Sequence, residues 1–310
     1  MEKEAKYKEL LNKCFMCPRS CKTDRNHGKK GFCGMDNRIF IARAALHMWE
    51  EPCISGKKGS GAVFFSGCGL RCCYCQNHDI AIGSRGLEIT EERLGEIFLE
   101  LQEQGAANIN LVTGAHYVPQ IINALDSARK QGLRLPVVYN SSGYENPDVL
   151  RLLEGYVDVY LPDMKYIKTD IAERFSHAPD YPGRAQAAIR EMVRQTGACK
   201  FDQEGYITGG TIVRHLILPG HTANSIEVLR YLHETYGNQI YISIMNQYTP
   251  VREIQEYPEL NRKVTKREYE KVLNAAVEMG ISKGFIQEGE TASESFIPEF
   301  DYEGVRKKVL

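Results

Sequence analysis

The sequence has 310 residues, of which 43% are hydrophobic and 25% are charged, a composition that is typical of soluble globular proteins and excludes an intrinsically disordered chain. The formal net charge of −1 provides no overall field that would attract nucleic acid or an anionic membrane, so neither is indicated as a partner. Because no apolar window is long enough to span a membrane and the N-terminus lacks the apolar core of a secretion signal, we expect a cytoplasmic protein.

The predicted elements divide the chain into a small and a large part. A short helix is expected near Glu4 to Lys13, but the rest of residues 1–56 shows little strand or helix period and is rich in Cys, Lys and Arg. We interpret residues 1–56 as a metal- or cluster-binding appendage and residues 57–310 as the core. Strands of the core are expected at 62–65, 109–112, 137–139, 157–161, 212–218, 240–245 and 284–286. Helices are expected at 91–104, 118–131, 147–154, 184–196, 225–236 and 266–279.

The helix boundaries carry their own signals. Thr90 precedes two glutamates, and Thr265 is followed three residues later by Glu268, as in a capping box. Glycines stand just after three of the helices, at Gly105, Gly132 and Gly280. Since about six βα units require long crossover connections, the strands are expected to be parallel. The predicted fold class is α/β, with a partial (β/α)6 barrel similar to a TIM barrel.

Nine of the ten cysteines lie before residue 76, which favours metal or cluster ligation over disulfides in a chain without a secretion signal. Cys68, Cys72 and Cys75 form a Cys-x3-Cys-x2-Cys pattern directly after the strand at 62–65, where parallel α/β folds place their chemistry. Structural zinc sites and ordinary four-iron clusters usually have four protein ligands, so three thiolates leave one coordination position open. Cys73 is adjacent to Cys72 and is expected to pack rather than to ligate. A buried group of thiols or a ferredoxin-like electron carrier remains the alternative.

This spacing, with the aromatic Tyr74 before the last cysteine, resembles the radical S-adenosylmethionine (SAM) superfamily. Over about residues 45–300 the chain is most similar to pyruvate formate-lyase activating enzyme and to homologues with a cysteine-rich N-terminus. The resemblance implies that Cys68, Cys72 and Cys75 bind a 4Fe-4S cluster, and that SAM chelates its open iron and is cleaved to a 5′-deoxyadenosyl radical. It also implies an oxygen-sensitive enzyme and a flavodoxin- or ferredoxin-type electron donor.

The resemblance places the cosubstrate SAM at the ends of successive strands. Relatives have Gly-Gly-Glu where this chain has Thr-Gly-Ala at 113–115, so the glutamate contact is missing. Asp163 and Lys165 match an Asp-x-Lys element and share one face of the strand, where the aspartate of relatives helps to hold a monovalent cation; a simple ion pair is the alternative. Arg214 lies in an apolar strand, and a buried arginine requires an anion. The cofactor-binding candidates are Tyr74, Thr113, Gly114, Ala115, Asn140, Ser141, Ser142, Asp163, Lys165, Arg214, Asn246 and Gln247.

Four further thiolates come from the appendage, in the pattern Cys14-x2-Cys17-x3-Cys21 followed by Cys33. They fit a second iron-sulfur cluster or a zinc ion, and the spacing does not decide between the two. Cys53 is interpreted as a packed residue, with a fifth ligand or a reactive group that faces the main site as the alternatives.

The resulting hypothesis is a radical SAM enzyme that abstracts a hydrogen atom, with the Cα hydrogen of glycine in a partner glycyl-radical enzyme as the leading substrate. Radical modification of another peptide, macromolecule or small molecule is the alternative reaction. A non-catalytic iron-sulfur or zinc-binding redox adaptor is the alternative from another class.

Overall fold

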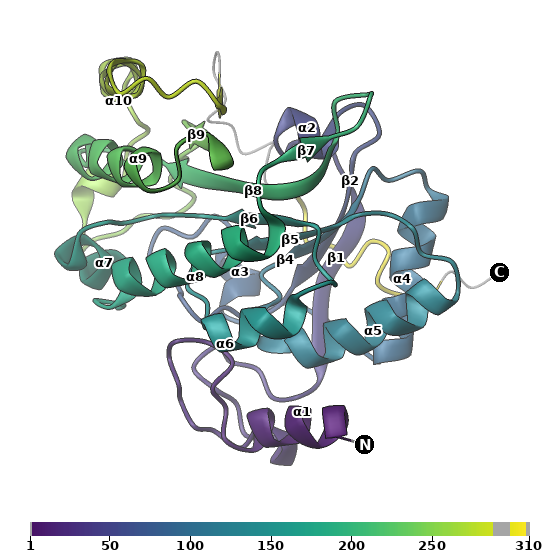
Figure 1. Cartoon of the computed structure of the whole chain (residues 1–310). Helices are drawn as coiled ribbons and strands as arrows, with labels where there is room; N and C mark the ends of the chain where they lie inside the picture. Colours follow the sequence, from purple (N-terminus) through teal and green to yellow (C-terminus); the bar gives the residue numbers. More distant parts are fainter. Residues whose placement is uncertain (1, 288–297, 308–310) are drawn as a thin grey trace.

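A computed structural model of the chain describes residues 2–287 and 298–307 and shows one curved sheet with helices packed around it (Figure 1). The described strands form a ten-stranded sheet in the order β10-β9-β8-β6-β5-β4-β2-β1-β3, and β7 pairs with β8. The neighbours along this path from β2 to β10 are parallel, whereas β1 and β3 extend one edge in antiparallel pairs and β7 pairs with β8 in an antiparallel way. Because β3 and β10 end this path without closing it, the sheet is an open, partial barrel, which confirms the predicted fold class.

The strands are β1 (Ile39–His47), β2 (Ser60–Phe65), β3 (Leu87–Ile89), β4 (Ile109–Val112), β5 (Val137–Ser141), β6 (Val159–Pro162), β7 (Lys200–Phe201), β8 (Ile207–Leu216), β9 (Tyr241–Met245) and β10 (Gly284–Ile286). The α-helices are α1 (Glu2–Asn12), α2 (Pro52–Ser55), α3 (His78–Ala81), α4 (Glu91–Glu103), α5 (Val118–Lys130), α6 (Pro147–Leu150), α7 (Thr169–Ser176), α8 (Tyr181–Thr196), α9 (Thr222–Tyr236) and α10 (Lys266–Glu278). Short 3-10 helices cover Arg25–His27, Ala115–Tyr117, Arg151–Leu153, Gly237–Gln239 and Pro258–Leu260.

Burial explains why the central strands are continuous apolar runs rather than alternating ones. Every residue of β2, β4, β5 and β6 is buried, because helices cover one face of the sheet and the barrel interior covers the other. On the helix side, Phe98 of α4 and Ile121 of α5 join the same core cluster as Val63 and Leu111. Strand positions are therefore fixed by packing, and the ends of the strands are held in place for the site.

The predicted helix boundaries are confirmed where their signals were explicit. The Thr90 side chain accepts a hydrogen bond from Arg93 N at the start of α4. Thr265 and Glu268 form a complete capping box at the start of α10. The glycines after α4, α5 and α10 all have positive φ angles, which only glycine adopts without strain: Gly105 (85°), Gly132 (106°) and Gly280 (78°).

β1 was not predicted, and the expectation that residues 14–56 lack strands is wrong at this point. The strand pairs with β2 from Ile41 opposite Phe65 to His47 opposite Ser60. Three alanines within it lowered its apparent strand propensity, although nearly every position is buried or half-buried by its neighbours. β1 therefore joins part of the N-terminal segment to the main sheet, and the division into 1–56 and 57–310 stays a prediction.

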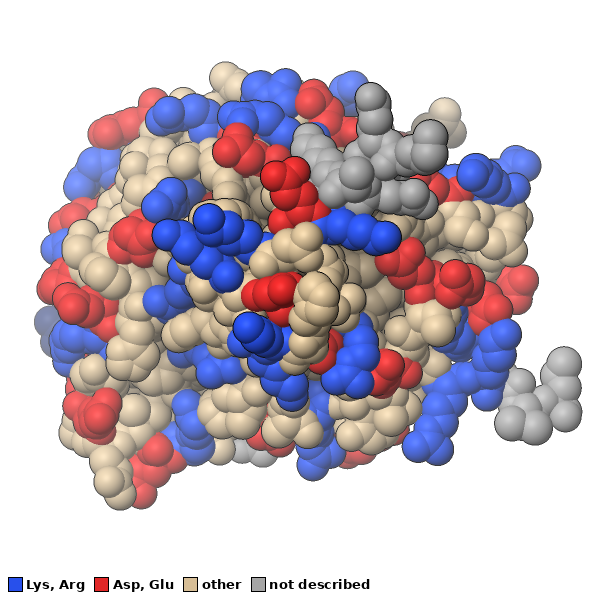
Figure 2. Space-filling model, turned by 90° about the horizontal axis from the view of Figure 1, so that it is seen from below, with Lys and Arg blue, Asp and Glu red and all other residues tan. Residues whose placement is uncertain are grey.

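The two ends of the barrel are occupied by different parts of the N-terminal segment. α1 and the loops after it lie at the bottom of the view in Figure 1, whereas α2 lies at the top. Figure 2 shows the lower face, where Lys and Arg side chains are interspersed with Asp and Glu side chains. In the described part of the chain, no helix combines the length and the apolar character that a membrane crossing requires.

Candidate functional site

A cavity of about 220 Å³ opens where the parallel strands end. Its lining includes the last residues of β2, β5, β8 and β9, which are Phe65, Ser141, Leu216 and Met245. Functional side chains at this position are carried by loops that a rigid barrel orients. Of the residues predicted for the site, the lining contains Cys68, Cys72, Tyr74, Cys75, Thr113, Asn140, Ser141, Ser142, Asp163, Lys165, Arg214 and Gln247.

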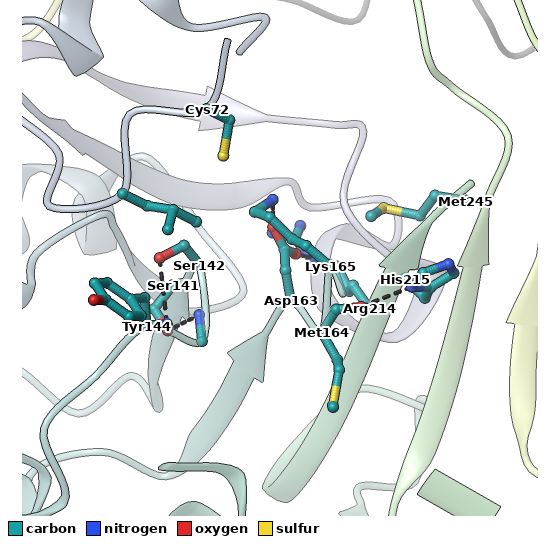
Figure 3. A network of polar contacts seen from close by, with 12 residues as sticks. Cys72, Ser141, Ser142, Tyr144, Asp163, Met164, Lys165, Arg214, His215 and Met245 are labelled. Carbon is teal, nitrogen blue, oxygen red and sulfur yellow. Dashed lines mark hydrogen bonds and ion pairs between the residues drawn. The ribbon is translucent and has the colours of Figure 1, made fainter. Parts of the chain in front are cut away.

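The loop after β2 brings the thiols of Cys68, Cys72 and Cys75 to this one cavity. Arg71, between the first two, has a φ of 55°, a conformation that non-glycine residues seldom adopt and that turns the loop back on itself. The backbone N–H of Leu70 donates to Cys68 Sγ at 3.4 Å. Figure 3 shows the Cys72 sulfur pointing toward the space between Ser142 and Lys165. The sequence pattern thus corresponds to three thiols with a common target.

Cys73 does not line the cavity and packs on the other side of the loop. Its backbone N–H donates to Phe175 O at 2.8 Å, and its carbonyl accepts a hydrogen bond from Arg252 Nη2 at 2.6 Å. Burial raises the pKa of its thiol to about 12, so the thiol is neutral at ordinary pH. The packing role expected for Cys73 agrees with this position.

Charged side chains form a connected network on the wall opposite the cysteines. Lys165 Nζ lies 2.6 Å from Asp163 Oδ2, and Arg214 Nε lies 2.9 Å from Asp163 Oδ1. Arg214 also donates to Glu50 Oε2 at 3.0 Å and to Asn140 Oδ1 at 2.6 Å. The Asn140 amide donates a hydrogen bond to Glu50 Oε1 at 3.1 Å. Two cations and two carboxylates are therefore held together, and the anion that Arg214 requires is supplied by the protein itself.

The network keeps its members charged despite their burial. Burial acts to raise the pKa of Asp163, but Lys165 and Arg214 outweigh it, and the pKa of this carboxyl is lowered. Burial acts to lower the pKa of Lys165, but Asp163 and the Cys72 thiol outweigh it, and the pKa is raised. Both directions agree that the pair is ionised, so Lys165 presents a permanent cation to the cavity.

The segment after β5 forms a tight polar turn beside this network. Gly143 has a φ of 73°, and a Cβ there would lie 2.2 Å from Asp163 O, so only glycine permits the close approach. The Gly143 N–H donates to Ser141 Oγ at 3.2 Å, and the Tyr144 N–H donates to Ser142 Oγ at 3.4 Å. Both hydroxyls therefore cap the turn, while they also line the cavity.

Three of the predicted cofactor-binding residues are not in the lining of this cavity. Gly114 is buried against Ile121, and Ala115 lines a second, smaller cavity. Asn246 is not in the lining, and its backbone N–H donates to Gln287 Oε1 at 2.6 Å. The motif positions carried over from relatives thus locate the strand ends, but not every side chain at those ends faces the cavity.

The sequence profile of the Radical SAM superfamily matches residues 62–232, which include the cysteine loop and every member of the network except Glu50. The chain belongs to the radical SAM superfamily. An uncharacterized protein of Methanocaldococcus jannaschii is 27% identical over 277 residues, which cover 87% of this chain and 75% of that protein. Pyruvate formate-lyase-activating enzyme of Clostridium pasteurianum is 30% identical over 114 residues, 35% of this chain and 46% of that enzyme.

Solved structures show the same radical SAM fold at low sequence identity. Streptococcus suis SuiB bound to S-adenosylmethionine superposes with a TM-score of 0.50 at 13% identity, over 72% of this chain. The match covers 49% of the SuiB chain, so this chain corresponds to about half of that protein. The likeness supports the partial-barrel architecture and carries no information on the substrate.

Membership of the radical SAM superfamily implies a 4Fe-4S cluster and SAM, and the donor set of the cavity fits both. Thiolates are the usual protein ligands of iron-sulfur clusters, and three converge here. Burial raises the pKa of Cys75 to about 12, while the nearby Lys165 ammonium acts in the opposite direction and favours the thiolate. The polar turn and the charged network supply groups for an amino acid carboxylate and ribose hydroxyls.

The four cysteines of the N-terminal segment gather in two tight loops. Cys14 N–H donates to Thr23 O at 3.0 Å, which closes the first loop, and the backbone turns again around Gly31. A Cβ at Gly31 would lie 3.1 Å from Cys21 Sγ and 3.6 Å from Cys33 Sγ, so these two sulfurs approach the same point. Among the residues that the structure describes, however, no three His, Cys, Asp or Glu side chains are arranged to hold a single metal ion, and this holds for Cys68, Cys72 and Cys75 as well as for the N-terminal cysteines.

These loops pack directly against the radical SAM cysteine loop. A second cavity of about 20 Å³ is lined by residues from both parts, including Cys17, Cys33 and Cys68. Gly67 has a φ of 90°, and a Cβ there would lie 2.9 Å from Cys33 O. The guanidinium of Arg25 is fully buried at this junction, 4.0 Å from Cys14 Sγ. The two groups of cysteines are therefore neighbours, although the larger cavity contains only one of them among its described lining residues.

Sequence reasoning missed several lining residues. His47, Glu50, Gln76 and Met245 all line the cavity. Met245 ends a predicted strand, so its place at the strand end was a usable signal. Glu50 had none, because it follows a strand that was not predicted and reaches its partners across the barrel. Cys53, whose role was left open, is buried beside Ile54 in the core and outside the cavity lining.

Proposed function

We propose that this radical SAM enzyme reductively cleaves SAM to methionine and a 5′-deoxyadenosyl radical, which then abstracts a hydrogen atom from a substrate. The observation that supports this function is the convergence of Cys68, Cys72 and Cys75 on one cavity. Three thiolates leave one position of a four-iron cluster open, and catalytic metal sites need such a position. The family supplies the radical chemistry, and the chain supplies binding, orientation and exclusion of water.

The cosubstrate is proposed to lie between the cysteine loop and the charged network. Lys165 is placed to meet its carboxylate, since its ammonium faces the cavity within reach of the thiols. Tyr74, which is buried beside Phe175 and Tyr248, would flank the adenine with its ring. Thr113 and the hydroxyls of the polar turn would meet the ribose. Asp163 is already paired with two cations, so a monovalent cation beside it would have to compete with Lys165.

The proposed substrate is the Cα hydrogen of a glycine in a partner glycyl-radical enzyme. The partial likeness to pyruvate formate-lyase-activating enzyme supports this choice, because it is a likeness of sequence and not of fold alone. Radical modification of another peptide, macromolecule or small molecule is the second candidate reaction. Incubation of the reduced protein with glycyl-radical enzymes and with peptides, followed by electron paramagnetic resonance, distinguishes the two by the presence of a glycyl radical doublet.

The N-terminal cysteines are proposed to bind a second iron-sulfur cluster or a zinc ion. Their two tight loops and the buried Arg25, which offsets thiolate charge, support a metal site rather than unliganded thiols. Metal analysis of a variant lacking Cys68, Cys72 and Cys75 separates iron from zinc at this site. An electron donor of the flavodoxin or ferredoxin type is also proposed, because the cluster must be reduced before it can cleave SAM. A reducing, cytoplasmic location is proposed because the ten cysteines are free thiols and the cluster is expected to be oxygen-sensitive.

Anaerobic reconstitution followed by addition of SAM and dithionite tests the function. We expect oxygen-sensitive iron at the barrel site and formation of 5′-deoxyadenosine, even without a substrate. A redox adaptor or a zinc-binding adaptor would form no 5′-deoxyadenosine under these conditions. Absence of the nucleoside from a protein that holds its full complement of iron would reject the proposal.

A further inference from the structure

A chain of buried hydroxyl groups ends on the sulfur of Cys72. Ser176 Oγ donates to Cys72 Sγ at 3.1 Å. The hydroxyl of Tyr166 lies 2.8 Å from Ser176 Oγ and 2.8 Å from the hydroxyl of Tyr74. Ser176 and Tyr166 are completely buried, and Cys72 and Tyr74 are nearly so. Water therefore does not replace these hydrogen bonds, and the four groups depend on one another.

A thiolate at Cys72 fixes the direction of the whole chain. A thiolate has no proton and can only accept, so Ser176 must donate its single proton to the sulfur. In the structure Tyr166 is the donor to Tyr74, whereas its contact with Ser176 can run in either direction. Once Ser176 has given its proton to the sulfur, its oxygen can only accept, so the proton of Tyr166 must turn from Tyr74 to Ser176 and Tyr74 must donate to Tyr166 in its place. Hydrogen bonds aligned in one direction polarise one another in a buried environment, so the bond to the sulfur is strengthened by the two behind it.

Arg19 of the N-terminal segment holds the residue that donates to Cys72. Its guanidinium donates to the carbonyls of Ser176 at 2.8 Å and of Gly69 at 2.9 Å, and it also contacts the carbonyls of Leu70 and His177. Ser176 is the last residue of α7, and Gly69 belongs to the cysteine loop. The Arg19 side chain thus connects the end of α7 to the cysteine loop, which contains the sulfur that Ser176 contacts. Arg19 itself lies in the stretch between Cys17 and Cys21, so the N-terminal cysteine loop carries the tie.

We propose that Ser176 is a positioning residue that raises the reduction potential of the cluster bound by Cys72, and that Arg19 keeps Ser176 at that sulfur. Reduction adds negative charge to a cluster and its thiolates, and a hydrogen-bond donor at a sulfur stabilises the more negative state. The inference rests on the proposed assignment of Cys72 as a ligand. It adds a role for the N-terminal segment that does not depend on which metal this segment binds.

A redox titration of the anaerobically reconstituted full-length protein, monitored by electron paramagnetic resonance, tests this proposal. For Ser176→Ala we expect the equilibrium constant for one-electron reduction to fall roughly tenfold, which corresponds to a shift of about 59 mV to more negative potential. Tyr166→Phe keeps the ring but loses the proton that Ser176 accepts, so a smaller shift in the same direction is expected. Arg19→Gln should also shift the potential in this direction.

Ser225→Ala is the matched control. Ser225 is buried like Ser176, but it lies in α9, and its hydroxyl has no hydrogen-bond partner among the described residues. The potential of this variant should equal that of the unmodified protein. If Ser176→Ala does not retain its cluster, Tyr166→Phe and Arg19→Gln provide the measurement instead.

The possible results separate this inference from the proposed function. An unmodified protein without oxygen-sensitive iron would overturn both. An unmodified protein that forms 5′-deoxyadenosine, with the same potential in Ser176→Ala and Tyr166→Phe, would overturn this inference alone. A negative shift in both variants, with no shift in Ser225→Ala, supports it.

Discussion

The two groups of cysteines lie side by side, but their surroundings differ in kind. Cys68, Cys72 and Cys75 face a cavity that also contains a permanent cation and a charged network. Of the N-terminal cysteines, Cys14 and Cys33 are buried among backbone turns, with the guanidinium of Arg25 beside Cys14, whereas Cys21 is exposed. An open site lined with fixed charges suits a small charged cosubstrate, whereas thiols held by backbone turns away from this cavity suit a metal that stabilises structure or transfers electrons. The comparison shows that the surroundings, and not the number of thiols, distinguish the two sites.

The largest effect is expected when one of the proposed cluster ligands of the open site is removed. Cys72→Ala should abolish 5′-deoxyadenosine formation and remove most iron from the barrel site, because two thiolates do not hold a four-iron cluster stably. Cys73→Ala is the control, one residue away and packed on the other side of the loop, and it should leave both properties largely unchanged. Iron content and nucleoside formation are measured on the same preparations. Equal losses in the two variants would contradict the ligand assignment.

The next expected effect concerns the buried charged network of the open site and its contribution to the free energy of unfolding. Arg214→Leu leaves Glu50 and Asp163 without their shared cation, and uncompensated buried charges typically cost about 3–5 kcal/mol of folding free energy. Chemical denaturation of the apoprotein measures this loss. Lys29→Leu, which changes an exposed residue of the N-terminal segment, should change the free energy of unfolding by less than about 0.5 kcal/mol. A loss for Arg214→Leu as small as that of the control would show that the network does not stabilise the fold.

A smaller effect is expected on the cosubstrate alone. Lys165→Met should weaken SAM binding roughly tenfold or more, since a hydrogen bond to a charged group contributes about 1.5–3 kcal/mol. Iron content should stay constant, because Lys165 is not a proposed ligand. Lys168→Met, which removes a surface ion pair with Glu227, provides the control. Equilibrium dialysis that gives the same affinity for Lys165→Met and the unmodified protein would exclude Lys165 from the cosubstrate site.

The smallest effect concerns the junction between the two sites. Burial and, to a smaller extent, the nearby Arg25 lower the pKa of His116 to about 3, from an ordinary value of 6.5. The unfolded chain therefore binds more protons below about pH 6.5, and the stabilisation by the neutral ring is lost as the pH falls toward 3. Between about pH 6 and pH 4 the free energy of unfolding should fall by about 2 kcal/mol from this residue.

His116→Gln should remove this part of the pH dependence, while the exposed His27→Gln should retain it. Denaturation midpoints measured across this range provide the test. A slope in His116→Gln equal to that of the unmodified protein would contradict the assigned protonation state.

The sequence predicted the parts of the site that are local in the chain. The three thiols follow one strand within a few residues, so their spacing alone brought them together. Asp163 and Lys165 do form an ion pair, but β6 ends at Pro162, so both follow the strand and the predicted strand period does not account for their contact. The contact of Ser176 with Cys72 joins residues 104 positions apart, and no local pattern encodes it. Glu50 was missed for the same reason, because its partners lie on β5 and β8.

The sequence predicted those elements of the fold that have a clear hydrophobic pattern. β4 and β10 begin and end at the predicted residues. β4 is a fully buried parallel strand, as its mainly apolar sequence indicates, whereas β10 is mostly exposed at the edge of the sheet. β8 begins five residues earlier than predicted, at Ile207, because Gly209 and Gly210 interrupt the apolar run there. β1 was missed because its alanines are buried by tertiary contacts rather than by their own hydrophobicity.

Glu50 makes the N-terminal segment part of the wall of the cavity. Its carboxylate accepts hydrogen bonds from Asn110, Asn140 and Arg214, and the carbonyl of Ile54 in α2 accepts one from Asn108. The electrostatics of the cavity are therefore set in part by a residue that precedes the first parallel strand. Exchange of Glu50 for a neutral residue would leave Arg214 with positive charge for an anionic ligand, although every strand end stays unchanged.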